Sequence, residues 1–129
     1  MNIFKNLFGN NSNSHESFNV ESYDAIIENM SEGDQLIIFK ASPRCLTSLM
    51  IEKSFDEWYE KNKTEKLKML KINVIAQRPL SNFIAEKYSI KHESPQLICV
   101  DSDENVIWQG SHGSITTEVL NELLIKHAE

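Results

Sequence analysis

The fold of this chain is decided by the stretch Leu36-Ile37-Ile38-Phe39-Lys40-Ala41-Ser42-Pro43-Arg44-Cys45-Leu46-Thr47-Ser48. Its apolar, β-branched first half predicts a buried strand, and the Ser-Pro break ends that strand. An amphipathic helix is expected to begin just after Cys45, because apolar side chains then recur at helical spacing. The sequence therefore predicts a thiol at a helix N-terminus, beyond the carboxyl end of a strand. Unpaired N–H groups and the helix dipole favour an anionic sulfur at such a place.

Composition limits the class of protein. The 129 residues allow one domain and a short tail, and the 40% hydrophobic and 25% charged content is typical of a globular fold. Because the net charge is -6 and the lysines are scattered among acids, nucleic acid and acidic membrane surfaces are poor candidates as partners. No apolar run approaches the roughly 20 residues of a membrane span, and no signal peptide is visible. Two cysteines are too few for a secreted disulfide scaffold, so we expect a cytoplasmic protein.

The periodicity along the chain predicts a flexible tail over residues 1–17 and one α/β domain over residues 18–129. Within the domain, a helix, strand, helix, strand, helix, hairpin and helix are expected in that order. Ser81 and Thr116 should cap the last two helices. Strands linked through a helix should lie parallel, whereas the hairpin adds an antiparallel pair. We therefore predict a mixed sheet of four or five strands with helices on both faces; the expected strands are residues 35–40, 67–74, 96–100 and 106–109.

The neighbours of Cys45 strengthen the prediction of a reactive thiol. One cysteine alone is a moderate signal, because cysteine also serves as a small buried hydrophobe. Arg44 adds a positive charge beside the sulfur, although an exposed arginine is more often simply solvated. Ser48 lies one helical turn further on, where its hydroxyl could hydrogen-bond a thiolate. Cys45, Ser48 and Arg44 are therefore the expected catalytic residues.

The spacing of the other candidate groups excludes several kinds of site. Ser48 takes the place of the second thiol of a Cys-x-x-Cys pair. Cys99 lies four residues beyond Pro95, or roughly 13 Å along a strand, whereas a disulfide needs Cα atoms within about 7 Å. If Pro95 lies beside Cys45, Cys99 is expected to be buried and inert. The 4 histidines are too scattered to predict a metal site, and a Cys/His hydrolase would need His112 beside the thiol.

Four segments together resemble a known family. A strand that leads to a cysteine at a helix start, with a later Ser94-Pro95 pair that opens another strand, resembles the thioredoxin superfamily. More closely, the set is similar to the monothiol bacilliredoxin-like proteins of the bacillithiol system, over about residues 18–128. The segments are Phe39 through Ser48, Ile75-Ala76-Gln77-Arg78-Pro79-Leu80-Ser81-Asn82, Lys91-His92-Glu93-Ser94-Pro95-Gln96, and Ser111-His112 through Ile115-Thr116.

The resemblance implies a thioredoxin-like fold in the cytoplasm of bacteria that use bacillithiol, a low-molecular-weight thiol. Cys45 is then the nucleophile on mixed disulfides between proteins and bacillithiol. Bacillithiolated proteins and bacillithiol are the partners, with bacillithiol as thiol co-substrate and no bound cofactor. The resemblance also implies a cis bond before Pro95, which would turn Ser94 toward the thiol and its substrate. This chain has Leu46 where members usually have proline, and Pro43 where a polar residue is usual, so its redox tuning should differ.

Bacillithiol carries its cysteine on a glucosamine–malate body, so a site that selects it should offer cations or N–H donors to the malate carboxylates. We expect Ser94, Pro95, Arg78, Ser111 and His112 to bind this substrate. Arg78 follows the second strand, and Ser111 and His112 stand at the start of the last helix, all on the cysteine's side of the sheet. Arg78 could instead be solvated, and His112 could be a loop hydrogen-bonder. The alternative to an enzyme is a non-catalytic thioredoxin-fold module that binds a partner or senses redox state.

Overall fold

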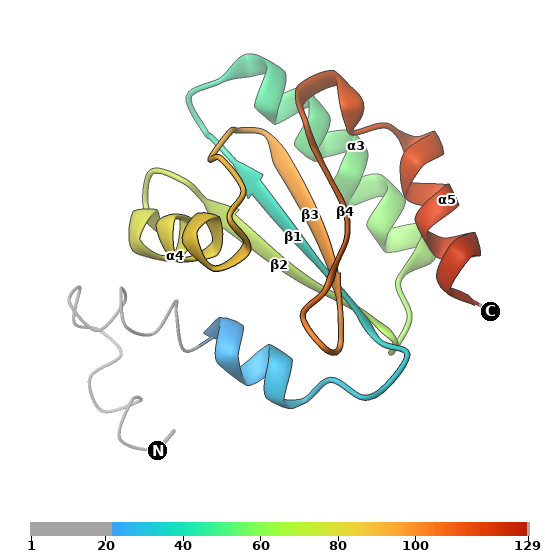
Figure 1. Ribbon diagram of the computed structural model, residues 1–129. Coiled ribbons are helices and arrows are strands. Elements are labelled where there is room, and N and C mark those ends of the chain that lie inside the picture. The colour runs from blue at the N-terminus through green and yellow to red at the C-terminus, as the bar shows by residue number, and fades with distance from the viewer. Residues whose placement is uncertain (1–21, 129) are drawn as a thin grey trace, which may run out of the picture.

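The computed structural model describes residues 22–128, so the tail predicted over residues 1–17 lies outside the described residues. The strands are β1 (Gln35–Ala41), β2 (Leu67–Asn73), β3 (Gln96–Asp101) and β4 (Val106–Ser111). They form a four-stranded sheet in the order β2-β1-β3-β4 (Figure 1). β1 runs parallel to β2 and antiparallel to β3, and β3 and β4 form an antiparallel hairpin.

Helices cover both faces of this sheet (Figure 1). α3 (Leu46–Asn62) and α5 (Thr117–Ala128) lie on one face, and α4 (Arg78–Tyr88) lies on the other, together with the helical residues 22–28. The predicted α/β fold, with a mixed sheet and helices on both faces, is therefore confirmed. No helix within the described range is long and apolar enough to cross a membrane.

The side chains of β1 point alternately to the two faces of the sheet and so contribute to both halves of the core. Ile37 and Phe39 belong to the cluster beneath α3 and α5, whereas Leu36 and Ile38 belong to the cluster beneath α4. The ring of Phe39 stacks on that of Phe55 in α3, with the ring centroids 4.7 Å apart. Because both of its faces are packed, β1 is a rigid base for the segment that follows it.

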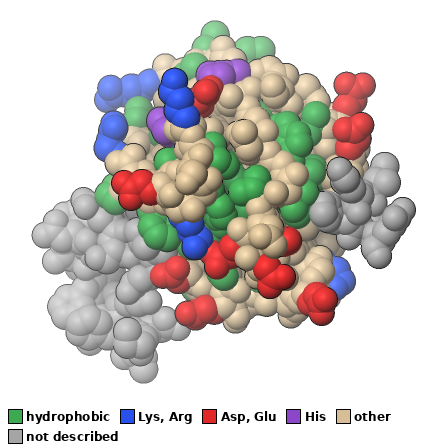
Figure 2. Space-filling view, in the orientation of Figure 1, with side chains coloured by type: hydrophobic (Ala, Val, Ile, Leu, Met, Phe, Trp, Pro, Cys, Tyr) green, Lys and Arg blue, Asp and Glu red, His purple; other side chains and the backbone are tan. Residues whose placement is uncertain are grey.

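Four connecting segments meet at the end of the sheet where β1 ends. The register pairs Lys40 of β1 with Gln96 of β3, and Gln96 with Ser111 of β4. The segments that follow β1, β2 and β4, and the one that precedes β3, therefore lie at this end. On the face drawn in Figure 2, most Lys, Arg and His side chains gather toward the upper left and most Asp and Glu toward the lower edge. On this face, the cationic side chains are thus concentrated toward one end.

The starts of the last two helices differ in how well they were predicted. α5 begins as expected, because the N–H of Val119 donates to the Thr116 hydroxyl at 3.2 Å. The prediction that Ser81 caps a helix is wrong, because α4 already begins at Arg78. Pro79 lies in the first turn of α4, where its fixed φ and missing N–H suit a helix start. Ser81 is instead buried within the helix.

The chain between β4 and α5 also differs from expectation. β4 continues to Ser111, because the strand pairing with Gln96 carries it beyond the predicted end at residue 109. His112–Ser114 then form a short 3-10 turn, η1, and α5 starts only at Thr117. The expectation that Ser111 and His112 stand at the start of the last helix is therefore wrong.

Candidate active site

Cys45 lies at the N-cap of α3, as the sequence predicts. Its backbone is extended, with φ -113° and ψ 120°, so the chain turns from loop to helix at this residue. Its carbonyl accepts a hydrogen bond from the N–H of Leu49 at 3.0 Å, and its own N–H donates to the Ser42 carbonyl at 3.4 Å. The thiol is partly exposed. It can therefore be reached by another sulfur, at the helix end where N–H groups lack helical partners.

Ser48 holds the loop that carries Cys45. Its side chain is fully buried, and its hydroxyl accepts a 2.9 Å hydrogen bond from the N–H of Ser42. The Ser42 hydroxyl in turn accepts a hydrogen bond from the N–H of Arg44 at 3.3 Å. Within the described part of the chain, the Ser48 hydroxyl contacts this backbone and not the sulfur. Its observed contact therefore positions the loop around the thiol.

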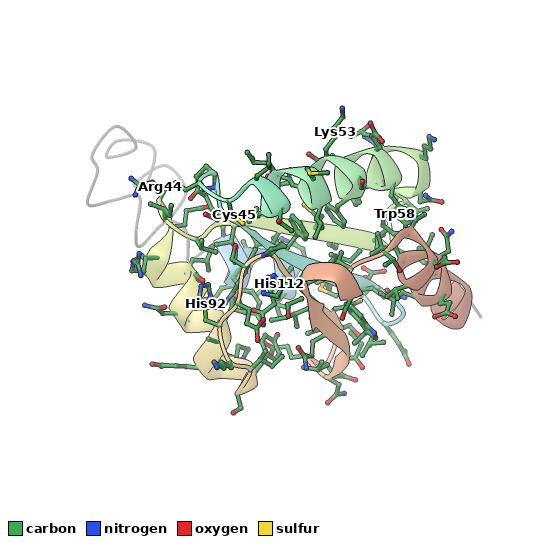
Figure 3. The ribbon with its side chains drawn as sticks, turned by 90° about the horizontal axis from the view of Figure 1, so that it is seen from above. Arg44, Cys45, Lys53, Trp58, His92 and His112 are labelled. Atoms are coloured by element: carbon green, nitrogen blue, oxygen red, sulfur yellow. The ribbon has the colours of Figure 1, made fainter. Side chains whose placement is uncertain are left out.

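The surface beside Cys45 is partly cationic and partly apolar. Arg44 is exposed at the start of α3 (Figure 3). Leu46, Leu49 and Met50 are apolar, yet 73%, 44% and 63% of their surface is exposed. Their spacing of three and four residues places them on one face of α3, which begins at the thiol. An apolar segment of another protein could pack there.

The Ser94–Pro95 turn lies beside the end of β1. Its peptide bond is cis, as the resemblance implies. Because Gln96 pairs with β1, Pro95 lies next to the residues that lead to Cys45. The Pro95 carbonyl accepts a hydrogen bond from the N–H of His112 at 3.0 Å. The Ser94 hydroxyl is buried, with no hydrogen-bond partner among the described residues. The fold thus brings this turn, His112 and the thiol to one end of the sheet.

Ser111 and His112 share a carboxylate that the sequence analysis missed. The Ser111 hydroxyl donates to Glu93 Oε1 at 2.8 Å, and His112 Nε2 lies 3.1 Å from the same oxygen. The hydrogen bond from Ser111 and the charge of His112 lower the pKa of Glu93. Glu93 precedes Pro95 by two residues, and no spacing rule relates it to the end of β4. Only the fold could reveal this cluster.

Arg78 lies near the segment that leads to the same turn, because its charge acts on His92. It is exposed and is the first residue of α4. Partial desolvation of the ring, the charge of Lys40 and the charge of Arg78 together lower the pKa of His92, although the residue as a whole is exposed. The charge of Arg78 therefore influences His92, which belongs to the segment that carries the Ser94–Pro95 turn. In Figure 3, which is seen from above, His92 lies toward α4, and His112 lies between it and α5.

Cys99 is separated from this end of the sheet. It pairs with Ile37 in the middle of β1, and it is fully buried. Its thiol lies 3.3 Å from Gln35 Oε1, to which it donates a hydrogen bond. Burial, with a smaller contribution from the charge of Asp101, raises the pKa of Cys99 to about 12. The prediction that Cys99 is buried is confirmed, and both cysteines are free thiols.

Comparison with solved structures identifies the class of protein that this fold defines. A candidate oxidoreductase with a thioredoxin fold superposes with a TM-score of 0.68 at 25% identity, over 80% of this chain and 86% of its own. The thioredoxin of Fasciola hepatica matches with a TM-score of 0.59 at 17% identity, over 81% and 89% of the two chains. The reduced thioredoxin pre-protein of Schistosoma mansoni matches with a TM-score of 0.61 at 15% identity, over 82% and 90%. The chain therefore has a thioredoxin fold.

A comparison with protein families is more specific. Residues 18–120 match the family described as monothiol bacilliredoxin BrxC, and the chain belongs to that family. The resemblance noted in the sequence is thereby confirmed. The two thiols agree with the monothiol description, because Cys45 is reachable and Cys99 is buried. Family and fold together support a thiol redox function.

Proposed function

We propose that this protein is a monothiol thiol-disulfide oxidoreductase that removes bacillithiol from protein mixed disulfides through Cys45. One observation carries the proposal: a single reachable thiol stands at a helix start in a member of the bacilliredoxin family, while the second thiol is buried in the sheet. A thiol in this setting can attack a disulfide sulfur. It has no neighbouring thiol to release the product, so a second bacillithiol or another reductant must regenerate the enzyme.

The first step is an attack by the Cys45 thiolate on the bacillithiol sulfur of the mixed disulfide. The bond between Cys45 and bacillithiol forms while the bond between bacillithiol and the protein sulfur breaks. The protein leaves as a thiolate and takes up a proton. In the second step, the thiolate of another bacillithiol attacks the bacillithiol sulfur on Cys45, which releases the enzyme thiolate and bacillithiol disulfide. The net change reduces the protein sulfur to a thiol and oxidises the second bacillithiol, without a bound cofactor.

The charge around Cys45 supports an anionic thiol as substrate. The whole chain has a net charge of -6. The segments that meet at this end nevertheless carry Arg44, Arg78 and Lys91 against one acid, Glu93. A malate body brings carboxylates, and Arg78 could bind one of them through two parallel hydrogen bonds. The local charge therefore favours bacillithiol over a neutral thiol.

Ser111 and His112 would bind the ligand only by exchanging a partner. Both already contact Glu93, through the 2.8 Å and 3.1 Å contacts to its Oε1. A malate carboxylate at this place would have to share their donors with Glu93 or displace it. Arg78 lies on α4 and does not depend on that exchange, so we assign it the larger part in carboxylate binding.

The protein half of the substrate could bind to the exposed apolar face of α3, which begins at the thiol. The exposed apolar face formed by Leu46, Leu49 and Met50 could pack against apolar residues beside the modified cysteine. The backbone at Ser94 could pair with the same segment in an extended conformation. These two contacts would hold the mixed disulfide with its bacillithiol half toward Arg78.

Mass spectrometry of the mixed reaction tests the first step. The reduced protein, incubated with a bacillithiolated protein, should gain the mass of one bacillithiol, and peptide mapping should place it on Cys45. Cys99→Ser is the matched control and should gain the same adduct, whereas Cys45→Ala should gain none. An adduct that added bacillithiol cannot discharge would identify a redox-sensing module instead. Absence of any adduct on Cys45 would refute the proposal.

A further inference from the structure

A buried lysine lies near the end of β1, and the reaction described above does not use it. Lys40 is fully buried. Its Nζ donates to the Ser81 carbonyl at 2.9 Å and lies 3.3 Å from His92 Nδ1. Neither partner is a carboxylate, and burial lowers the pKa of Lys40 to about 8. An ammonium buried beside neutral partners is costly, so a strand that retains one invites a functional explanation.

The contact with Lys40 determines which form His92 adopts. An ammonium group can only donate hydrogen bonds, so Nδ1 must carry a lone pair and the ring proton must sit on Nε2. The Ser81 hydroxyl lies 3.3 Å from the same Nδ1 and can also donate to it. Burial, Lys40 on β1 and Arg78 on α4 all lower the pKa of His92, while Glu93 acts in the opposite direction. A protonated Nδ1 would face the ammonium, and the contact would be lost.

His92 belongs to the segment that carries the Ser94–Pro95 turn. Through His92 and Ser81, one ammonium ties this segment to β1 and to α4 at the same time. The side chain of Gln96 holds the segment at a second point, because its Nε2 donates to the Lys91 carbonyl at 2.8 Å. β1 itself leads directly into the loop of Cys45. Lys40 therefore links the strand that leads to Cys45 with the segment that leads to the Ser94–Pro95 turn.

We propose that Lys40 is a positioning residue: through neutral His92 it holds the Ser94–Pro95 turn against Cys45, and protonation of His92 loosens that turn and weakens the binding of the protein substrate. This inference deepens the proposed exchange reaction, and its kinetic test rests on that reaction. The state of His92 can be measured without any activity, so the two can fail separately.

Nuclear magnetic resonance of the His92 ring tests the contact itself. In the wild-type protein, the ring nitrogens should report the Nε2–H tautomer, and the titration midpoint should lie below 6.5. Lys40→Met keeps an unbranched side chain one atom shorter than lysine and removes the charge, so the midpoint should rise. Lys71→Met is the matched control, because Lys71 lies on the opposite face of the sheet, paired with Glu52 and Asp56. A midpoint that Lys40→Met leaves unchanged would overturn the proposal.

Exchange kinetics as a function of pH test the positioning role. His92 is exposed, so its substitution should leave the fold intact. His92→Asn keeps an acceptor near Nδ1 but cannot titrate, whereas His92→Leu removes the acceptor. The KM for a bacillithiolated protein should rise about ten-fold in His92→Leu at every pH, the loss expected for a hydrogen bond to a charged group. In the wild-type protein, the KM should rise only at acidic pH, where His92 becomes protonated. In His92→Asn, the KM should stay at the value that the wild-type protein has at neutral pH.

The outcomes separate the alternatives. A KM for His92→Asn that follows His92→Leu would refute the role of the Nδ1 acceptor. If the KM rose as much in Lys71→Met as in His92→Leu, the cause would be a general loss of sheet stability, and this result would also refute the positioning role. If the wild-type protein exchanges no bacillithiol at all, the proposed function fails, while the titration of His92 still decides whether Lys40 controls its state.

Discussion

The N–H of Ser42 donates a 2.9 Å hydrogen bond to the hydroxyl of Ser48, and Cys45 lies in the loop that this bond closes. Because Ser48 is fully buried, the bond holds the loop from within. A Cys-x-x-Cys protein would have its second thiol at this position. Ser48, which takes the place of that second thiol, therefore also stabilises the loop that carries Cys45.

Ser48→Ala should lower the free energy of unfolding. The substitution leaves the part-buried N–H of Ser42 without its side-chain acceptor, which should cost about 1–3 kcal/mol. Urea unfolding measures the change. Ser54→Ala, on the exposed side of α3, is the matched control and should stay within about 0.5 kcal/mol of the wild type. Equal stabilities for the two variants would contradict a structural role for the Ser48 hydroxyl.

Substitution of the two cysteines should separate stability from activity. Cys99→Ser buries a hydroxyl in an apolar strand, at a cost of about 1–3 kcal/mol. The cost should fall near the lower end, because Gln35 Oε1, now 3.3 Å from the sulfur, could accept the new hydroxyl. Exchange activity should be unchanged. Cys45→Ser should keep the unfolding free energy and lose exchange. If Cys99→Ser lost exchange without losing stability, Cys99 would be a resolving thiol.

Arg78→Ala should slow exchange with bacillithiol mixed disulfides selectively. Loss of a charged hydrogen bond should raise the barrier by about 1.5–3 kcal/mol. Exchange with a small neutral disulfide should hardly change, because that substrate carries no carboxylate. Lys91→Ala is the matched control for a nearby exposed cation and should have a smaller effect. Equal losses on both disulfides would mean that Arg78 acts on the thiolate or on the fold.

Lys40 should make stability depend on pH in the alkaline range. Its pKa falls from 10.5 in the unfolded chain to about 8 in the fold, because burial penalises the charge. Below about pH 8, the folded protein carries this penalty in full; as the pH rises toward 10.5, the penalty is relieved and stability increases. Lys40→Met should therefore be more stable than the wild type at pH 7, by a margin that narrows above pH 8. A margin that widens with pH would contradict the buried charge.

The fold could be predicted from the sequence where its signals are local. The apolar run before Ser42 had to be a buried strand, because both of its faces are hydrophobic and a Ser-Pro break ends it. Thr116 could also be predicted as an N-cap from a local signal, because its hydroxyl bonds to a residue only three positions away. The position of Cys45 at a helix start follows from the same kinds of local signal: an apolar strand that ends at a break, and a helical pattern that begins after it.

Other parts of the site depend on contacts between distant residues, which no local pattern reports. Ser81 looked like a cap, but Pro79 starts the helix earlier and the fold buries Ser81 beside Lys40. Lys40 itself sits in an apolar run, where a charged residue is expected to face solvent. Glu93 meets Ser111 only because β3 and β4 pair. These residues are the ones for which the structure adds new chemistry.

Steady-state turnover on a bacillithiolated protein tests the central claim most directly. With bacillithiol as the reductant, the wild-type protein and Cys99→Ser should release the protein thiol repeatedly and form bacillithiol disulfide in equal amount, whereas Cys45→Ala should release none above the uncatalysed rate. Release by Cys45→Ala at the wild-type rate, or release by the wild type that stops after one equivalent, would contradict the claim that Cys45 catalyses this exchange.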